Sequence, residues 1–176
     1  MGERAIKKLW DVGHTSIREL ETPQGILASG KAEIYGCLFG RDSLITSLTL
    51  LDVYERTRDV YYLALVRKVL TNLAKLQGND VNIESGEEPG KIIHEFRPDN
   101  HAHLTAEGAP PWYVYPDDVM RNYDTADATP LFLMTLHAYL RASGDVNFVE
   151  GMLPSVRAAL DWMRCYGDSN NDGLFD

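Results

Sequence analysis

The residues best suited to chemistry follow a short loop that glycines bound. Gly36 and Gly40 enclose the loop, and Arg41 and Asp42 stand side by side directly after it. Residues 44 to 54 are almost entirely apolar, which predicts a helix surrounded by protein. An Arg–carboxylate pair held at the start of such a helix can form charge-assisted hydrogen bonds to vicinal hydroxyl groups. The alternative for Asp42 is helix capping or an interaction with the helix dipole.

A second chemical group precedes another apolar segment. Asp127 stands just before residues 131 to 140, which again leave almost no polar face, and for this residue helix capping is again the alternative. Residues 79 to 124 are too long for a structureless connection in a compact domain, and their aromatic content argues against disorder. We therefore expect an ordered, functional loop region there. Its candidate residues are His94, Glu95, Arg97, Asp99, Trp112, Tyr113, Tyr115 and Tyr123.

The elements that must position these groups repeat along the chain. Residues 4 to 20 predict an amphipathic helix, and two buried helices, from about 41 to 56 and after 127, are each followed by a helix with a solvent face. Asp59-Val60 matches Asp145-Val146 at a shift of 86 residues, and Pro154 is expected to kink or restart the last helix. Short turns make each pair an antiparallel hairpin, so both buried helices start at one end. Arg41 and Asp127 are therefore predicted to share a rim.

The alternation of buried and solvent-facing helices favours an all-α fold. Inner helices ringed by outer helices form an α/α toroid, of which this chain would supply two to three hairpins. An irregular bundle explains the burial but not the alternation. On the predicted rim, aromatic rings and charged hydrogen-bonding groups are the combination that a sugar requires. The alternatives are a hydrophobic plug for Trp112, Tyr113 and Tyr115, an ordinary loop histidine for His94, and a core histidine for His137.

Four segments carry a resemblance to a known family. Residues 35–46 (YGCLFGRDSLIT), 89–97 (PGKIIHEFR), 127–132 (DATPLF) and 168–174 (DSNNDGL) resemble the amylo-α-1,6-glucosidase, or glycogen debranching, family. The resemblance begins near Gly25 and implies an (α/α)6 barrel that hydrolyses α-glucosidic bonds with inversion. It also implies that Arg41 and Asp42 hold hydroxyls of the terminal glucose. The expected substrate-binding set is Arg41, Asp42, Glu95, Arg97, Trp112, Tyr123 and Asp127.

The same resemblance places the catalytic acid and base beyond residue 176, so no catalytic residue is expected here. We therefore expect residues 1–176 to be a single helical domain, the N-terminal portion of a larger enzyme acting on an α-glucan or oligosaccharide, and inactive alone. The alternative is a non-catalytic helical module that binds sugar or protein. In both cases the apolar inner helices are expected to favour self-association or a partner chain.

Composition excludes several classes of function. The 176 residues are 44% hydrophobic and carry a net charge of −9, which suits one compact unit and disfavours nucleic-acid binding. No apolar run reaches the roughly 18 residues of a membrane span, and the amphipathic start lacks a signal core, so a cytoplasmic protein is expected. No cofactor or metal is expected. Asp168, Asn170 and Asp172 resemble the opening of a calcium loop, but a sharp Asp-Asn-Gly turn is the simpler interpretation because the required Glu is missing.

Overall fold

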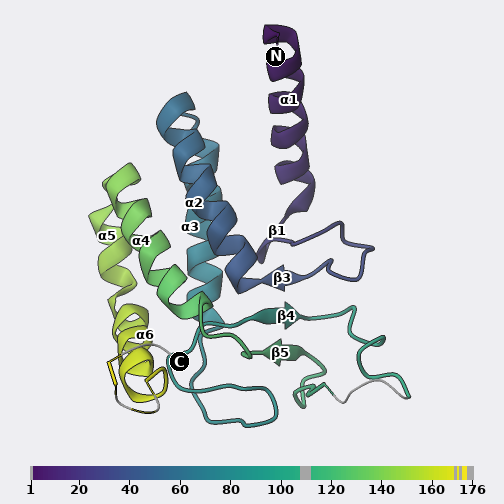
Figure 1. Ribbon diagram of the computed structural model, residues 1–176, viewed down its shortest axis with the longest axis vertical. Helices are drawn as coiled ribbons and strands as arrows, with labels where there is room; N and C mark the ends of the chain where they lie inside the picture. The colour runs from purple at the N-terminus through teal and green to yellow at the C-terminus, as the bar shows by residue number, and fades with distance from the viewer. Residues whose placement is uncertain (1, 108–111, 169, 171, 174–176) are drawn as a thin grey trace.

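The computed structural model describes residues 2–107, 112–168, 170 and 172–173. In these residues the chain is mostly helical, with two small sheets (Figure 1). The helices are α1 (Glu3–Leu20), α2 (Gly40–Thr57), α3 (Val60–Lys75), α4 (Ala128–Ser143), α5 (Val146–Gly151) and α6 (Leu153–Cys165). The prediction of an all-α chain is therefore right for the dominant elements and wrong for the sheets.

Two helical hairpins form the body of the molecule. The turn between α2 and α3 passes through Arg58 in a left-handed conformation, and the Asp59 carboxylate accepts a hydrogen bond from the Tyr61 N–H at 3.0 Å. Between α4 and α5, Gly144 takes the left-handed position and Asp145 caps the Phe148 N–H at 3.1 Å. The two turns thus repeat the same capping chemistry at the predicted shift of 86 residues.

The inner helices α2 and α4 lie side by side and start at the same end of the molecule (Figure 1). Helix α3 packs against both of them, and α6 packs against α4. The predicted last helix is divided into α5 and α6, and the second part restarts with Pro154 in its first turn. Fully buried apolar side chains fill the space between the helices, among them Leu44, Leu65, Leu70 and Phe132.

A small antiparallel sheet carries the starts of both inner helices. Its strands are β3 (Leu38–Phe39), β4 (Glu95–Arg97) and β5 (Met120–Asn122), in that order, and β3 leads directly into α2. A second pair, β1 (Glu21–Thr22) and β2 (Gly25–Ile26), joins α1 to this region. Sequence reasoning missed β4 and β5 because strands of three residues are too short to show an alternating pattern.

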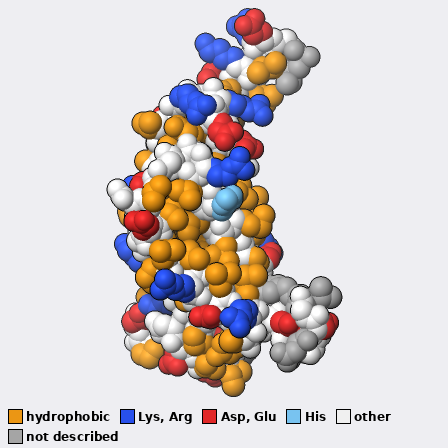
Figure 2. Space-filling view, turned by 90° about the vertical axis from the view of Figure 1, so that its left-hand side faces the viewer, with side chains coloured by type: hydrophobic (Ala, Val, Ile, Leu, Met, Phe, Trp, Pro, Cys, Tyr) orange, Lys and Arg blue, Asp and Glu red, His pale blue; other side chains and the backbone are white. Residues whose placement is uncertain are grey.

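We predicted that protein surrounds both inner helices, and this is wrong for one side of each helix, which is exposed. Ile45 on α2 is 50% exposed and Met134 on α4 is 58% exposed. His137 was expected in the core, but it is exposed on α4. The reason is that neighbouring described helices cover only part of each inner helix. Figure 2 shows apolar side chains gathered in the middle of the face that carries α4, α5 and α6.

Helix α1 has the predicted amphipathic pattern but buries none of its residues. Its apolar side includes Leu9, Trp10 and Val12, each about half exposed. In Figure 1 the N-terminal part of the helix stands apart from the two hairpins. From its middle onward the helix contacts the first hairpin, where Nδ1 of His14 is hydrogen-bonded to the Tyr62 hydroxyl at 2.5 Å. None of the described helices combines the length and the apolar character that crossing a lipid bilayer requires.

Candidate functional site

The starts of α2 and α4 are joined by an ion pair. Nη1 of Arg41 donates to Oδ2 of Asp127 at 3.3 Å, and both side chains are about half exposed. The predicted shared rim is therefore confirmed. Asp127 stands at the N-cap position of α4, but its side chain makes no capping hydrogen bond and instead accepts one from the Thr125 hydroxyl. Simple capping is thus not the role of Asp127.

The loop that precedes β4 clamps the rim in place. The Gly40 N–H donates to the His94 carbonyl at 2.8 Å, and the His94 N–H donates to the Asn122 carbonyl at 2.8 Å. The Ile92 N–H donates to the Thr129 hydroxyl at 2.9 Å, which ties the same loop to α4. A Cβ at Gly40 would lie 2.1 Å from the Ile93 carbonyl oxygen, so only glycine allows this approach.

Aromatic side chains lie on the segment that leads into α2 and on the loop that clamps it. The Phe39 ring meets the His94 ring edge-on with centroids 5.4 Å apart, and Tyr35, which is 59% exposed, meets Phe39 at 6.1 Å. The Nδ1 atom of His94 is buried and has no hydrogen-bond partner in the described part of the chain. Burial, helped by the Arg41 charge, lowers the pKa of His94 although Glu95, Asp127 and Asp42 oppose it. The surroundings of the ring therefore favour its neutral form.

The charges at the rim favour hydrogen bonding over proton transfer. Burial acts to raise the pKa of Asp127, but hydrogen bonds from Thr125 and Arg41 outweigh it and bring the pKa below its ordinary value. Asp42 lies in the first turn of α2 and is exposed, where the helix dipole stabilises a carboxylate. The rim therefore presents one guanidinium that donates hydrogen bonds and two carboxylates that accept them.

Glu95 and Arg97 lie inside the fold rather than on the open rim, which corrects the expectation that they contact a ligand. They are 4% and 2% exposed and are bonded to each other. Arg97 also donates to the Asn100 carbonyl at 3.0 Å and to the Ile34 carbonyl at 2.9 Å. Both side chains leave β4 on the same side, and the segment around Ile34 folds over them. Opposite charges two residues apart were the available signal for this pairing.

The two aromatic residues of the expected site are also placed differently. Tyr123 is 2% exposed, and its hydroxyl donates to the Leu76 carbonyl at 2.9 Å, so this ring belongs to the core. Trp112 is half-buried, and among the described residues it makes no hydrogen bond or ring contact with the Arg41–Asp127 pair. Phe39 stands two residues before Arg41 and contacts the His94 ring, and Tyr35 contacts Phe39. Nothing local in the sequence distinguishes these two rings from core residues.

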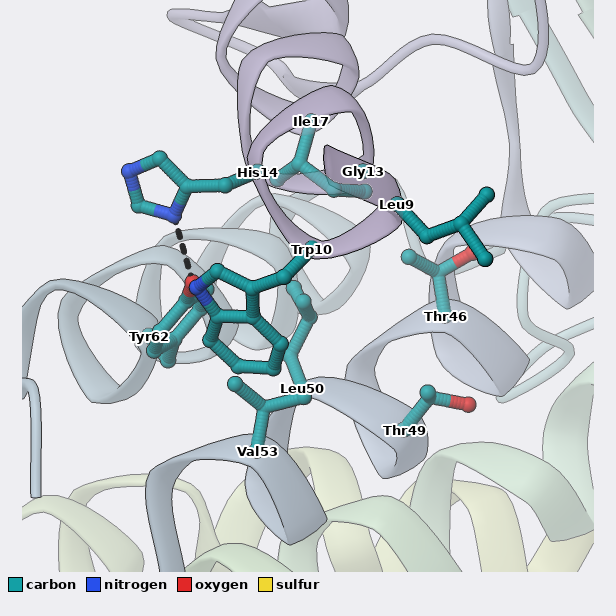
Figure 3. A pocket seen from close by; sticks show the side chains of 10 residues that line it. All are labelled: Leu9, Trp10, Gly13, His14, Ile17, Thr46, Thr49, Leu50, Val53 and Tyr62. Atoms are coloured by element: carbon teal, nitrogen blue, oxygen red, sulfur yellow. Dashed lines mark hydrogen bonds between the residues drawn. The ribbon is translucent and has the colours of Figure 1, made fainter. Parts of the chain in front are cut away.

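The cavities lined in part by α2 include one beside the rim and one beside α1. One of about 210 Å³ adjoins the rim and is lined by Asp42, Ser43 and Thr46, together with residues of the segment 26–28. The other, of about 240 Å³, lies between α1 and the first hairpin, and Figure 3 shows Trp10, Leu50 and Val53 around it. Its apolar lining suits no sugar. Of these two, the first cavity is therefore the one placed to extend the rim site.

The residues that resembled a calcium loop form a turn. The Asp168 carboxylate accepts hydrogen bonds from the backbone N–H groups of Asp172 and Gly173 at 2.9 and 3.0 Å, and the Asn170 side chain accepts a second one from Asp172. The predicted sharp turn is thus confirmed, while Ser169, Asn171 and Leu174 of the same motif lie outside the described residues. In the described ranges, no group of three or more His, Cys, Asp or Glu side chains is arranged to hold a metal ion.

Comparison with known proteins assigns this chain to no family. The chain matches no model of a protein family, and no curated protein matches it significantly.

Proposed function

We propose that this chain supplies the sugar-binding rim of a glycoside hydrolase of the glycogen-debranching type, which acts on α-1,6-linked or related α-linked glucans. The observation that supports the proposal is the Arg41–Asp127 ion pair at the joint start of α2 and α4. Its groups can donate to and accept from vicinal hydroxyls with charge-assisted hydrogen bonds. Tyr35 and Phe39, on the segment that leads into Arg41, offer apolar ring surface for the C–H face of a sugar.

The arrangement of the hairpins supports the finer proposal of an (α/α)6 toroid. Two hairpins stand side by side with parallel inner helices, as successive units of such a ring must. The half-exposed Ile45 and Met134 lie on inner-helix sides that a further hairpin would cover. In this proposal the enzyme works in the cytoplasm, and the rim residues described above lie around the mouth of the ring.

The proposed role of the rim is binding and not bond cleavage. Inverting hydrolysis requires a carboxylic acid with a raised pKa and a carboxylate base, roughly 6.5–9.5 Å apart. Asp127 has a lowered pKa, which suits a hydrogen-bond acceptor and disfavours a general acid. Asp42 is exposed in the first turn of α2, so it is not enclosed as a general acid in a water-excluded site would be. We therefore expect no release of glucose from an α-1,6-linked oligosaccharide by this chain alone.

A titration with isomaltose, followed by amide resonances, tests the proposal. Isomaltose is expected to shift the amides of Arg41, Asp42 and His94, and Arg41→Ala is expected to weaken binding about tenfold or more through loss of a charged hydrogen bond. Arg56→Ala, an exposed basic residue in the last turn of the same helix, is the matched control. Equal affinity in the wild type and Arg41→Ala would contradict the rim assignment, and glucose release would contradict the binding-only role.

The exposed apolar sides of α2 and α4 support a second candidate, a non-catalytic module that associates with itself or a partner. Sedimentation of the wild type and of an Ile45→Lys, Met134→Lys variant separates the two. Association that the variant abolishes, without any isomaltose-dependent shift, would favour the module over the hydrolase.

A further inference from the structure

A polar cavity lies where α3 ends, among residues that take no part in the rim. Its volume is about 330 Å³, at the lower end of the range typical of small-molecule sites, roughly 300–1,000 Å³. Lys75 and Asp80 line it from the end of α3 and the loop after it, Glu87 from the following turn, and Tyr115 and Arg121 from the segment around β5. Most small-molecule sites are predominantly apolar, so this lining indicates a polar ligand.

Glu87 is the central group of this cavity. It is 7% exposed, its Oε1 accepts the Asn79 N–H at 3.0 Å, and its Oε2 accepts the Tyr115 hydroxyl. No described Lys, Arg or His forms an ion pair with it. A buried carboxylate is costly without compensating partners, and it has about four acceptor positions, of which the described residues use two. The remaining positions are available to hydroxyl donors of a ligand.

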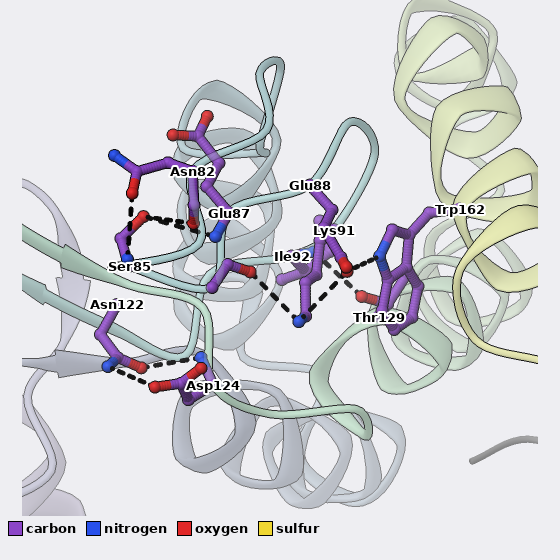
Figure 4. Close-up of polar contacts among 11 residues, drawn as sticks. Asn82, Ser85, Glu87, Glu88, Lys91, Ile92, Asn122, Asp124, Thr129 and Trp162 are labelled. Carbon is purple, nitrogen blue, oxygen red and sulfur yellow. Dashed lines mark hydrogen bonds and ion pairs between the residues drawn. The ribbon is translucent and has the colours of Figure 1, made fainter. Parts of the chain in front are cut away.

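The turn that carries Glu87 is rigid. Backbone hydrogen bonds link Asn82 and Glu87 in both directions at 2.9 and 3.0 Å, and the Asn82 side chain accepts the Ser85 N–H. The Ser85 carbonyl accepts the Tyr123 N–H at 2.8 Å, which fastens the turn to the end of β5. Figure 4 shows this network around Asn82, Ser85 and Glu87. The carboxylate is therefore positioned before any ligand arrives.

The far end of the same loop is fixed to α6. Trp162 Nε1 donates to the Glu88 carboxylate at 2.7 Å, and Lys91 pairs with that carboxylate at 3.3 Å (Figure 4). A loop anchored on both sides of Glu87 loses little conformational entropy when a ligand binds, and such preorganisation increases affinity.

The charges around the cavity select the class of ligand. The Arg121 guanidinium lies 4.8 Å from the centre of the Tyr115 ring and pairs with Asp117, and the exposed Lys75 lies at the cavity edge. The acidic side chains Glu87 and Asp80 are balanced by the basic side chains Lys75 and Arg121, so the lining favours neither an anion nor a cation. A neutral ligand with many hydroxyl groups can use both the donors and the acceptors.

We infer that this cavity binds a neutral polyhydroxylated ligand, a single sugar residue or the end of an oligosaccharide, at a site separate from the Arg41–Asp127 rim. The assignment rests on Glu87 and its surroundings and does not require that the rim binds sugar.

The test uses the full chain with Arg41→Ala and Asp127→Ala, which silences the rim, and maltose as the probe. Maltose is expected to shift the amides of Asn79, Glu87 and Arg121 in a saturable manner. Adding Glu87→Gln is expected to weaken this binding about tenfold or more because a charged acceptor is lost. Glu84→Gln, an exposed acid in the same turn, is the matched control and is expected to leave the affinity unchanged.

A second variant keeps the test conclusive if Glu87→Gln fails to fold. Asn79→Trp places a bulky side chain at an exposed position of the cavity lining and leaves the backbone N–H that holds Glu87 in place. It is expected to abolish the maltose shifts while the thermal unfolding curve stays unchanged. Two results would overturn the inference: no saturable shift with maltose in the rim-silenced chain, or saturable shifts with inorganic phosphate in place of maltose.

Discussion

Arg41 and Asp127 are 86 residues apart in the chain, yet their side chains meet at 3.3 Å and bridge the first turns of α2 and α4. Because both are about half exposed, solvent screens the pair and its contribution to stability is small, about 0–1 kcal/mol. The fold therefore depends little on this pair, which leaves both side chains free to serve the binding role proposed for the rim.

The first prediction follows from that exposure. Arg41→Ala and Asp127→Ala are each expected to lower the free energy of unfolding by less than about 1 kcal/mol. The double variant is expected to lose about as much as either single variant, because both changes remove the same contact. Urea unfolding followed by circular dichroism measures all three. A loss above about 3 kcal/mol in either single variant would show that the pair is chiefly structural.

The second prediction concerns the buried pair on β4. Arg97→Met leaves the Glu95 carboxylate inside the fold without its cation and is expected to destabilise the chain by about 3–5 kcal/mol. Replacing Glu95 by Met as well is expected to restore part of this loss, because two apolar side chains then fill the site. Arg41→Met, at an exposed pair, is the control in the same urea series. If Arg97→Met is as stable as Arg41→Met, the pair has no structural role.

The third prediction compares two glycines. Gly40→Ala puts a Cβ 2.1 Å from the Ile93 carbonyl and is expected to destabilise the chain by about 1–3 kcal/mol, because loop and helix must separate. Gly13→Ala, inside α1 with nothing within 4 Å, is expected to be neutral or to stabilise that helix by up to about 1 kcal/mol. Thermal unfolding of the two glycine variants measures the changes in stability. A titration of Gly40→Ala with isomaltose measures whether the rim still binds. Unchanged binding in a destabilised Gly40→Ala chain would mean that the clamp does not position the rim.

Local chemistry explains which parts of the fold the sequence could predict. Asp59 and Asp145 cap their helices through the next few residues, so their pattern in the chain is enough to place the two turns. The common start of α2 and α4 follows from those turns together with helix periodicity. The contact between Arg41 and Asp127 was therefore predictable although it is distant in sequence.

What the sequence could not predict depends on segments that fold back from elsewhere. Glu95 and Arg97 were expected on the rim, but the chain around Ile34 covers them and accepts a hydrogen bond from Arg97. Tyr123 became a core residue because the end of α3 supplies the Leu76 carbonyl to its hydroxyl. Such coverage has no local signature in the residues that become covered.

The last prediction concerns pH and His94. Burial lowers the pKa of His94 in the folded chain below its ordinary value of 6.5, so the folded state resists protonation more than the unfolded state does. The contribution of this residue to stability is therefore fully present above pH 6.5 and is lost as the pH falls below it, until the folded state also takes up the proton. The free energy of unfolding is expected to fall less between about pH 7.5 and about pH 5.5 in His94→Gln than in the wild type. His137→Gln, at an exposed position on α4, is the matched control and is expected to follow the wild type. Identical pH slopes for His94→Gln and the wild type would show that this ring titrates alike in both states, and the claim that its surroundings favour the neutral imidazole would then have to be abandoned.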